Sequence, residues 1–124
     1  MKRLDHPYLY TQDLPYLESV LGPERFAECL RCIDRTITIV MRDPLQEGAA
    51  LTRPPLETFR KKKFHSTFSP PRRVHPDLRL VYRYDPREDI LFVLGVGLRH
   101  PRSDDDVYVR INVRAIEPSS LSDS

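Results

Sequence analysis

Basic side chains that could bind phosphate gather in one stretch of the sequence. Between Arg60 and Arg83 there are eight lysines and arginines and one acidic residue, Asp77. Cations at this density are typical of a polyanion-binding surface, with nucleic acid the first candidate, and equally of a face that only keeps a protein soluble. His65 lies in the same stretch, and an imidazole that titrates near neutral pH can accept or donate a proton. The stretch therefore predicts either a phosphate-binding surface with acid–base capacity or an inert solvated face.

Two other groupings could hold a metal ion, and neither is expected to do so. Cys29 and Cys32 form a CxxC motif, but a structural zinc site needs four ligands and the sequence has no second pair at a suitable spacing. The motif falls inside a segment with helical periodicity, so we expect buried, unreactive thiols. Three consecutive carboxylates, 104–106, could bind Mg²⁺, yet a solvated loop is the stronger interpretation. We therefore expect no metal and no cofactor.

Length and composition exclude several classes of protein. The chain has 124 residues, of which 40% are hydrophobic, 20 are basic and 18 are acidic. This length predicts a single domain over residues 1–118, and the polar end predicts a flexible tail over 119–124. No apolar run approaches the roughly 20 residues that cross a bilayer, and no apolar stretch follows the basic N-terminus as in a signal peptide. Two cysteines cannot form a disulfide framework, so we expect a reducing cytoplasm and no membrane association.

The first half of the chain predicts two helices. An apolar stripe with helical spacing runs from Pro23 to Arg42, and Pro44 ends it. A shorter helix is expected over 14–21, with Asp13 as its N-cap and Gly22 as its stop. A short aromatic strand is expected before it, over 7–11. The stripe of the long helix consists of Phe26, Leu30, Ile33, Ile37, Val40 and Met41.

The second half predicts strands. Alternation of apolar and polar residues indicates strands over 60–68, 78–84 and 107–114, and the apolar run 90–98 indicates a central strand covered on both faces. Gly95 and Gly97 leave one face of that run bare, so another element can approach its backbone.

The order of the main elements is β-α-α-β-β-β, which predicts an α+β fold. We expect a small, mostly antiparallel, twisted sheet with two helices packed on one face. The other face is expected to carry Lys61, Lys63, His65, Arg79 and Arg83.

Several motifs follow one another in this second half. An arginine-led strand, L-R-L-V-Y-R-Y, begins at Leu78; after a tight turn, an apolar strand ends in V-G-L-R at Arg99, and Tyr108 follows. This combination resembles the C-terminal half of the RelE/ParE toxin superfamily over about 61–108, and the N-terminal half matches that family in element order. The RelE branch comprises ribosome-dependent mRNA endonucleases held inactive by an antitoxin, whereas the ParE branch lacks the nuclease residues and poisons DNA gyrase.

The resemblance implies a set of site residues. Its catalytic positions fall on Lys63, His65, Arg79, Arg99 and Tyr108 of this chain, with further RNA contacts expected from Lys61, Lys62, Arg72, Arg73 and Arg83. The sequence departs from the family pattern in three places. The connection 69–76 is longer than the usual turn, a histidine stands where RelE has a second lysine, and the acidic run 104–106 lies between two of the implied residues.

These residues would suit metal-independent RNA cleavage, in which the ribose 2′-hydroxyl attacks the adjacent phosphorus. Arg79 and Arg99 would clamp phosphate oxygens, because a guanidinium binds two at once. His65 could serve as base or acid, and Lys63 could be a base if neighbouring cations lower its pKa. Tyr108 could orient the hydroxyl, act as a base or stack on a nucleobase.

The expected function is therefore that of a toxin of a type II toxin–antitoxin system that cuts mRNA on the ribosome. The alternatives are a non-enzymatic, ParE-like inhibitor of DNA gyrase and an inactive family member, because fold does not settle function. Either toxin implies an acidic antitoxin that covers the basic face and folds as it binds.

Overall fold

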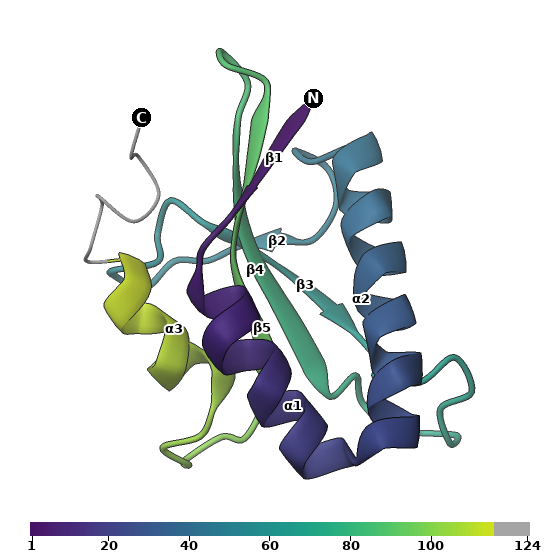
Figure 1. Ribbon diagram of the computed structural model, residues 1–124. Helices are drawn as coiled ribbons and strands as arrows, with labels where there is room; N and C mark the ends of the chain where they lie inside the picture. Colours follow the sequence, from purple (N-terminus) through teal and green to yellow (C-terminus); the bar gives the residue numbers. More distant parts are fainter. Residues whose placement is uncertain (116–124) are drawn as a thin grey trace.

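A computed structural model describes residues 1–115 and shows an α+β fold (Figure 1). One five-stranded sheet has the order β1-β5-β4-β3-β2, in which β1 pairs with β5 in parallel and the other neighbours are antiparallel. The strands are β1 (Lys2–Asp5), β2 (Ala49–Ala50), β3 (Arg60–Phe64), β4 (Leu78–Asp85) and β5 (Ile90–Leu98). The helices are a π-helical turn η1 (Leu9–Asp13), α1 (Leu14–Leu21), α2 (Pro23–Arg42) and α3 (Val107–Ala115).

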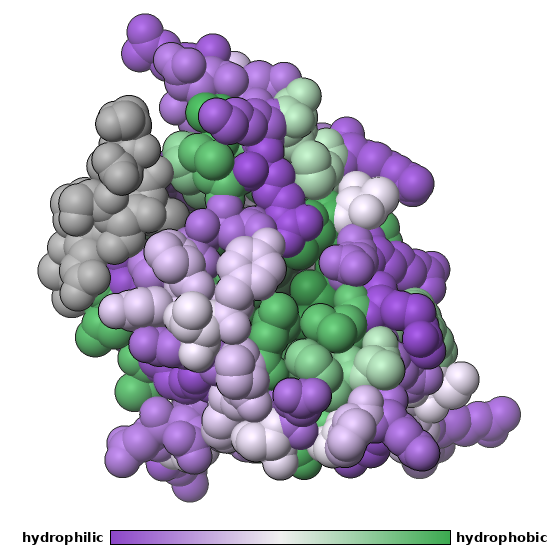
Figure 2. Space-filling model, in the orientation of Figure 1, coloured by the Kyte–Doolittle hydropathy of each residue, from purple (hydrophilic) through white to green (hydrophobic). Residues whose placement is uncertain are grey.

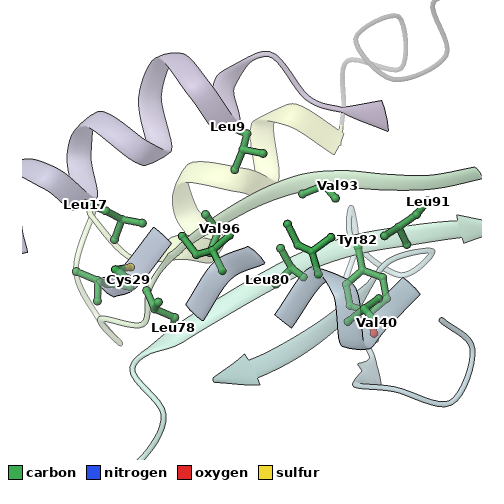
Figure 3. Packing of buried hydrophobic residues seen from close by; sticks show 13 residues of the cluster. Leu9, Leu17, Cys29, Val40, Leu78, Leu80, Tyr82, Leu91, Val93 and Val96 are labelled. Carbon is green, nitrogen blue, oxygen red and sulfur yellow. The ribbon is translucent and has the colours of Figure 1, made fainter. Parts of the chain in front are cut away.

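Helices α1 and α2 cover one face of the sheet, as predicted. Gly22, with a φ of +83°, ends α1, and Pro23 begins α2 directly afterwards because its fixed φ suits a first helical turn. Apolar side chains are visible between the two helices, while polar ones cover their outer surfaces (Figure 2). Figure 3 shows side chains of both helices against those of β4 and β5. This core includes Leu17, Cys29, Ile33, Ile37, Val40, Leu78, Leu80, Tyr82, Leu91, Val93 and Val96.

Helix α3 packs on the opposite face, so that α2 and α3 lie on either side of β4 and β5 (Figure 1). Val107 and Ile111 of α3 pack against Val81 and Leu94 together with Leu56 and Phe59. The two glycines of β5 permit this approach: a Cβ at Gly97 would lie 3.1 Å from Val107 Cγ2, and one at Gly95 would lie 2.7 Å from Asp13 Oδ2. The expected close approach at the bare face of this strand is confirmed.

The strand predicted over 107–114 is wrong, because these residues form α3. The segment satisfies two periods at once: its apolar residues alternate, but Val107 and Ile111 are also four apart, as on one face of a helix. Those two are buried, whereas Val109 and Val113 are 50% and 56% exposed. Asp106 resolves the ambiguity, since its carboxylate accepts a hydrogen bond from the backbone N–H of Tyr108 at 3.2 Å and so caps the helix.

The strand predicted over 7–11 is also wrong. The first strand is β1, where Lys2 pairs with Ile90, and the segment after it turns into η1. The backbone carbonyl of Pro7 accepts hydrogen bonds from the N–H groups of Tyr10 and Thr11 at 3.2 and 3.3 Å. These local bonds replace the ladder that a strand would need.

Strand β3 is shorter than the predicted 60–68. It ends at Phe64, because the backbone N–H of Ser66 donates instead to the Asp77 carboxylate at 2.9 Å. The tail expected over 119–124 lies outside the described residues. No helix within residues 1–115 combines the length and apolar character needed to cross a membrane.

Candidate phosphate-binding site

Three cations from two strands share the face of the sheet on which α3 lies. Lys63 of β3 stands opposite Arg79 of β4, which in turn stands opposite Gly97 of β5. Lys61 stands opposite Val81, two residues further along the same face. Since side chains alternate along a strand, the pairing places the two lysines and the arginine together beside α3.

Arg99 joins this group from the end of β5 and is held by Asp106. Its Nη1 donates to Asp106 Oδ2 at 2.6 Å, and its guanidinium carbon lies 5.0 Å from the centre of the Tyr108 ring. The other Asp106 oxygen accepts the backbone N–H of His100 at 2.6 Å. One buried carboxylate thus caps α3 and orients the Arg99 guanidinium, while Asp104 and Asp105 are exposed.

Replacing Asp106 with alanine is expected to lower the free energy of unfolding by roughly 2 kcal/mol. The substitution removes the helix cap and the charge-assisted bonds to Arg99 and His100. Urea denaturation of purified protein measures the change. Asp104→Ala is the matched control and should stay within about 0.5 kcal/mol of wild type, because its side chain is exposed. Equal stability of the two variants would contradict the capping role.

Arg79 and Tyr108 lie deeper in the group. Arg79 is buried, and its Nη1 donates to the backbone carbonyls of Pro76 and Leu78 at 2.8 and 3.0 Å. The Tyr108 hydroxyl is buried and makes no well-aligned hydrogen bond to residues 1–115. Burial raises the pKa of Tyr108, although the nearby guanidinium groups of Arg79 and Arg99 oppose this rise. Tyr108 is therefore a neutral phenol at neutral pH, able to donate its proton in a hydrogen bond.

Lys61 is the lysine of this group with a lowered pKa. Partial burial is the main cause, and the positive charges of Lys63, Arg79 and Arg99 add to it. Both effects disfavour the ammonium form. Lys63, which the sequence offered as a possible base, is exposed two residues further along β3.

Lys61, Arg99 and Tyr108 open onto a pocket of about 450 Å³. One side of the pocket comes from the segment 51–56, between β2 and β3. Arg53 of this segment and Asn112 of α3 also reach the pocket, and the sequence patterns singled out neither. The complete lining is Leu51, Thr52, Arg53, Pro54, Leu56, Lys61, Arg99, Tyr108 and Asn112.

Other residues implied by the resemblance lie elsewhere. His65 follows the end of β3, and no hydrogen bond or ion pair to another described residue ties it to the group. Lys62 points to the opposite face of the sheet and pairs with Glu47 at 2.8 Å. Arg83 lies over the rings of Phe59 and Phe92, at 5.5 and 4.9 Å.

Arg72 and Arg73 are exposed in the connection between β3 and β4. That connection lies beside α2, across the molecule from α3 (Figure 1). The guanidinium of Arg35 in α2 lies 5.7 Å from the ring of Phe68, which fixes the connection there. These two arginines therefore do not join the pocket.

A buried ion pair that the sequence did not indicate holds α3 in place. Arg114 Nη1 and Nη2 donate to the two carboxylate oxygens of Asp13, each at 2.7 Å, and Nη1 also donates to the carbonyl of Leu94 at 3.2 Å. Asp13 Oδ2 accepts the backbone N–H of Val96 at 3.0 Å as well. Asp13 was expected to cap α1, but its side chain makes no capping bond. It joins η1, β5 and α3 instead.

The cysteines lie in α2, far from this chemistry. Both thiols are free and buried, as expected, and burial raises the pKa of Cys29 to about 12. A thiol with so high a pKa has almost no reactive thiolate at neutral pH. Over residues 1–115, no three His, Cys, Asp or Glu side chains are grouped so as to hold a metal ion.

Comparison with known proteins adds no assignment to this site. No protein-family model, no curated protein and no solved structure matches the chain. The resemblance to RelE/ParE toxins over about 61–108 stays a prediction from the sequence.

Proposed function

We propose that this protein is a metal-independent endoribonuclease of the RelE type, a cytoplasmic toxin that cuts mRNA on the ribosome. The observation that carries the proposal is the convergence of Lys61, Lys63, Arg79 and Arg99 with the phenol of Tyr108 beside one pocket. Two guanidinium groups and the Lys63 ammonium suit a phosphodiester, and Lys61, whose pKa is lowered, supplies a base in its neutral form.

The reaction can be written with these side chains alone. Unprotonated Lys61 takes the proton of the ribose 2′-hydroxyl, and that oxygen attacks the adjacent phosphorus. Arg79 and Arg99 stabilise the charge that develops on the phosphorane oxygens. Tyr108 donates a proton to the 5′-oxygen as the bond between phosphorus and that oxygen breaks. The products are a 2′,3′-cyclic phosphate and a free 5′-hydroxyl. Lys61 then releases its proton to water and Tyr108 takes one from water, so both side chains return to their starting forms.

The fold supports the same proposal. Apart from the two-residue β2, the order from β1 to β5 keeps the β-α-α-β-β-β pattern of the RelE/ParE superfamily. The motifs that carry the resemblance form β4 and β5, two neighbouring inner strands of the sheet, and the start of α3. Such a toxin would be held inactive by an acidic antitoxin segment that covers the cations.

A second candidate is a ParE-like toxin that binds DNA gyrase without cutting RNA. The observation in its favour is that His65 is not among the residues that line the pocket. Arg99 is also engaged with Asp106, which lowers its charge toward a ligand. A family member without either activity would share these features.

Cleavage on translating ribosomes tests the proposal. Wild-type protein is expected to cut mRNA in the presence of a metal chelator and to leave 5′-hydroxyl ends. Arg99→Ala and Tyr108→Phe should each slow cutting at least about tenfold, because each removes a transition-state contact. Arg87→Ala is the matched control, since Arg87 is exposed in the turn between β4 and β5. If a variant that carries both substitutions cuts at the wild-type rate, the assignment of Arg99 and Tyr108 to the active site is refuted. Gyrase inhibition without RNA cleavage would favour the second candidate.

A further inference from the structure

The pocket beside the cations has an apolar wall that phosphate binding does not require. Leu56 is 4% exposed, and Leu51 and Pro54 of the same segment line the pocket with it. The ring of Tyr108 lines the pocket from α3. A flat, apolar ligand group would therefore find contacts from both the segment and the helix.

The lining of the pocket also includes one side-chain amide, that of Asn112. Asn112 lies four residues after Tyr108 in α3, so the two side chains stand on the same face of the helix. An amide presents a donor and an acceptor side by side, the pattern that a nucleobase edge also presents. The volume of about 450 Å³ falls within the roughly 300–1,000 Å³ of small-molecule sites, well above the needs of a phosphate group alone.

We propose that this pocket binds a nucleobase, with the base against the Tyr108 ring and its edge read by the Asn112 amide. The phosphate of the same nucleotide lies on Lys61 and Arg99, which also line the pocket. Stacking on an aromatic ring strengthens binding for any base, whereas amide hydrogen bonds distinguish one base from another. The proposal rests on the proposed function for its ligand, RNA, and adds the side chain that sets base preference.

Binding of small nucleotides tests this without any cleavage. The four nucleoside 3′-monophosphates and ribose 5-phosphate are titrated into the full chain by calorimetry at one fixed salt concentration. Wild-type protein is expected to bind its best nucleotide at least tenfold more tightly than ribose 5-phosphate and to rank the four bases. Asn112→Ala should bind ribose 5-phosphate as before and lose most of the ranking.

Val113→Ala provides the matched control, because Val113 is the next residue of α3 and 56% exposed outside the pocket. Circular dichroism confirms that both variants keep the wild-type fold. Equal affinity for nucleotides and ribose 5-phosphate would overturn the proposal, as would a base ranking that survives Asn112→Ala. Base-dependent binding by a protein that cuts no RNA would uphold the pocket and refute the nuclease. RNA cleavage without base-dependent binding would refute the base pocket and uphold the nuclease.

Discussion

Replacing Arg114 with methionine is expected to lower the free energy of unfolding by about 3–5 kcal/mol. The change removes the bidentate partner of the buried Asp13 carboxylate, which then keeps, among the described residues, only Arg110 at 3.9 Å and the backbone N–H of Val96. A loss of this size is a large share of the roughly 5–15 kcal/mol by which proteins of this kind are stable. Urea denaturation at neutral pH measures it, with the exposed Arg87→Met as the control.

A second variant separates loss of the ion pair from loss of packing. Asp13→Asn combined with Arg114→Met removes both charges, and the asparagine oxygen can still accept the backbone N–H of Val96. This double variant should regain at least half of the lost stability, because no charge remains buried alone. If Arg114→Met alone costs less than about 1 kcal/mol, the pair is not what holds α3 on the sheet.

Replacing Lys61 with methionine is expected to slow RNA cleavage by about 10²–10⁴-fold, the usual contribution of a general base. Lys61→Arg should be similarly slow, because arginine keeps the charge but does not deprotonate. Lys62→Met is the matched control, since Lys62 faces the other side of the sheet and pairs with Glu47. Full activity of Lys61→Arg would show that Lys61 binds phosphate and takes no proton.

The lowered pKa of Lys61 also fixes the direction of two pH dependences. Cleavage by the wild type should rise with pH until the folded-state pKa is passed, because only the neutral amine accepts a proton. Below that pKa, the folded state carries a charged Lys61 that the unfolded state accommodates better. Stability linked to Lys61 is therefore lost as the pH falls through the folded-state pKa and is fully present above the unfolded value. Lys61→Met should accordingly be more stable than wild type at neutral pH, as chemical denaturation would show.

The sequence predicted secondary structure best where the spacing of its apolar residues fitted either a helix or a strand but not both. The bounds of α1 and α2 match the prediction, because proline and glycine mark their ends and the apolar stripe of α2 has a single interpretation. The central strands 78–84 and 90–98 were likewise predicted closely. The segment from Val107 satisfied both a strand period and a helix period, and only the Asp106 cap decides between them. Asp106 can be recognised as a helix cap in the sequence only once the helix that follows it is known.

The candidate site was predicted in part. Alternation along β3 and β4 placed Lys61, Lys63 and Arg79 on one face, and the structure agrees. The sequence could not show that Asn112 reaches the same pocket, since this depends on α3 being a helix. The pairing of Asp13 with Arg114 spans 101 positions, and no local pattern reports a contact between residues so far apart.

The hairpin of β4 and β5 also determines the order in which the parts of the site form during folding. Its strands adjoin in the sequence, so the loop that must close is short and Arg79 and Arg99 assemble early. Docking of α3 needs partners near the start of the chain and therefore follows later. A chain caught between these two events has a cationic sheet without Tyr108 in place. In such a chain the pocket would still lack the side that α3 supplies, Tyr108 and Asn112.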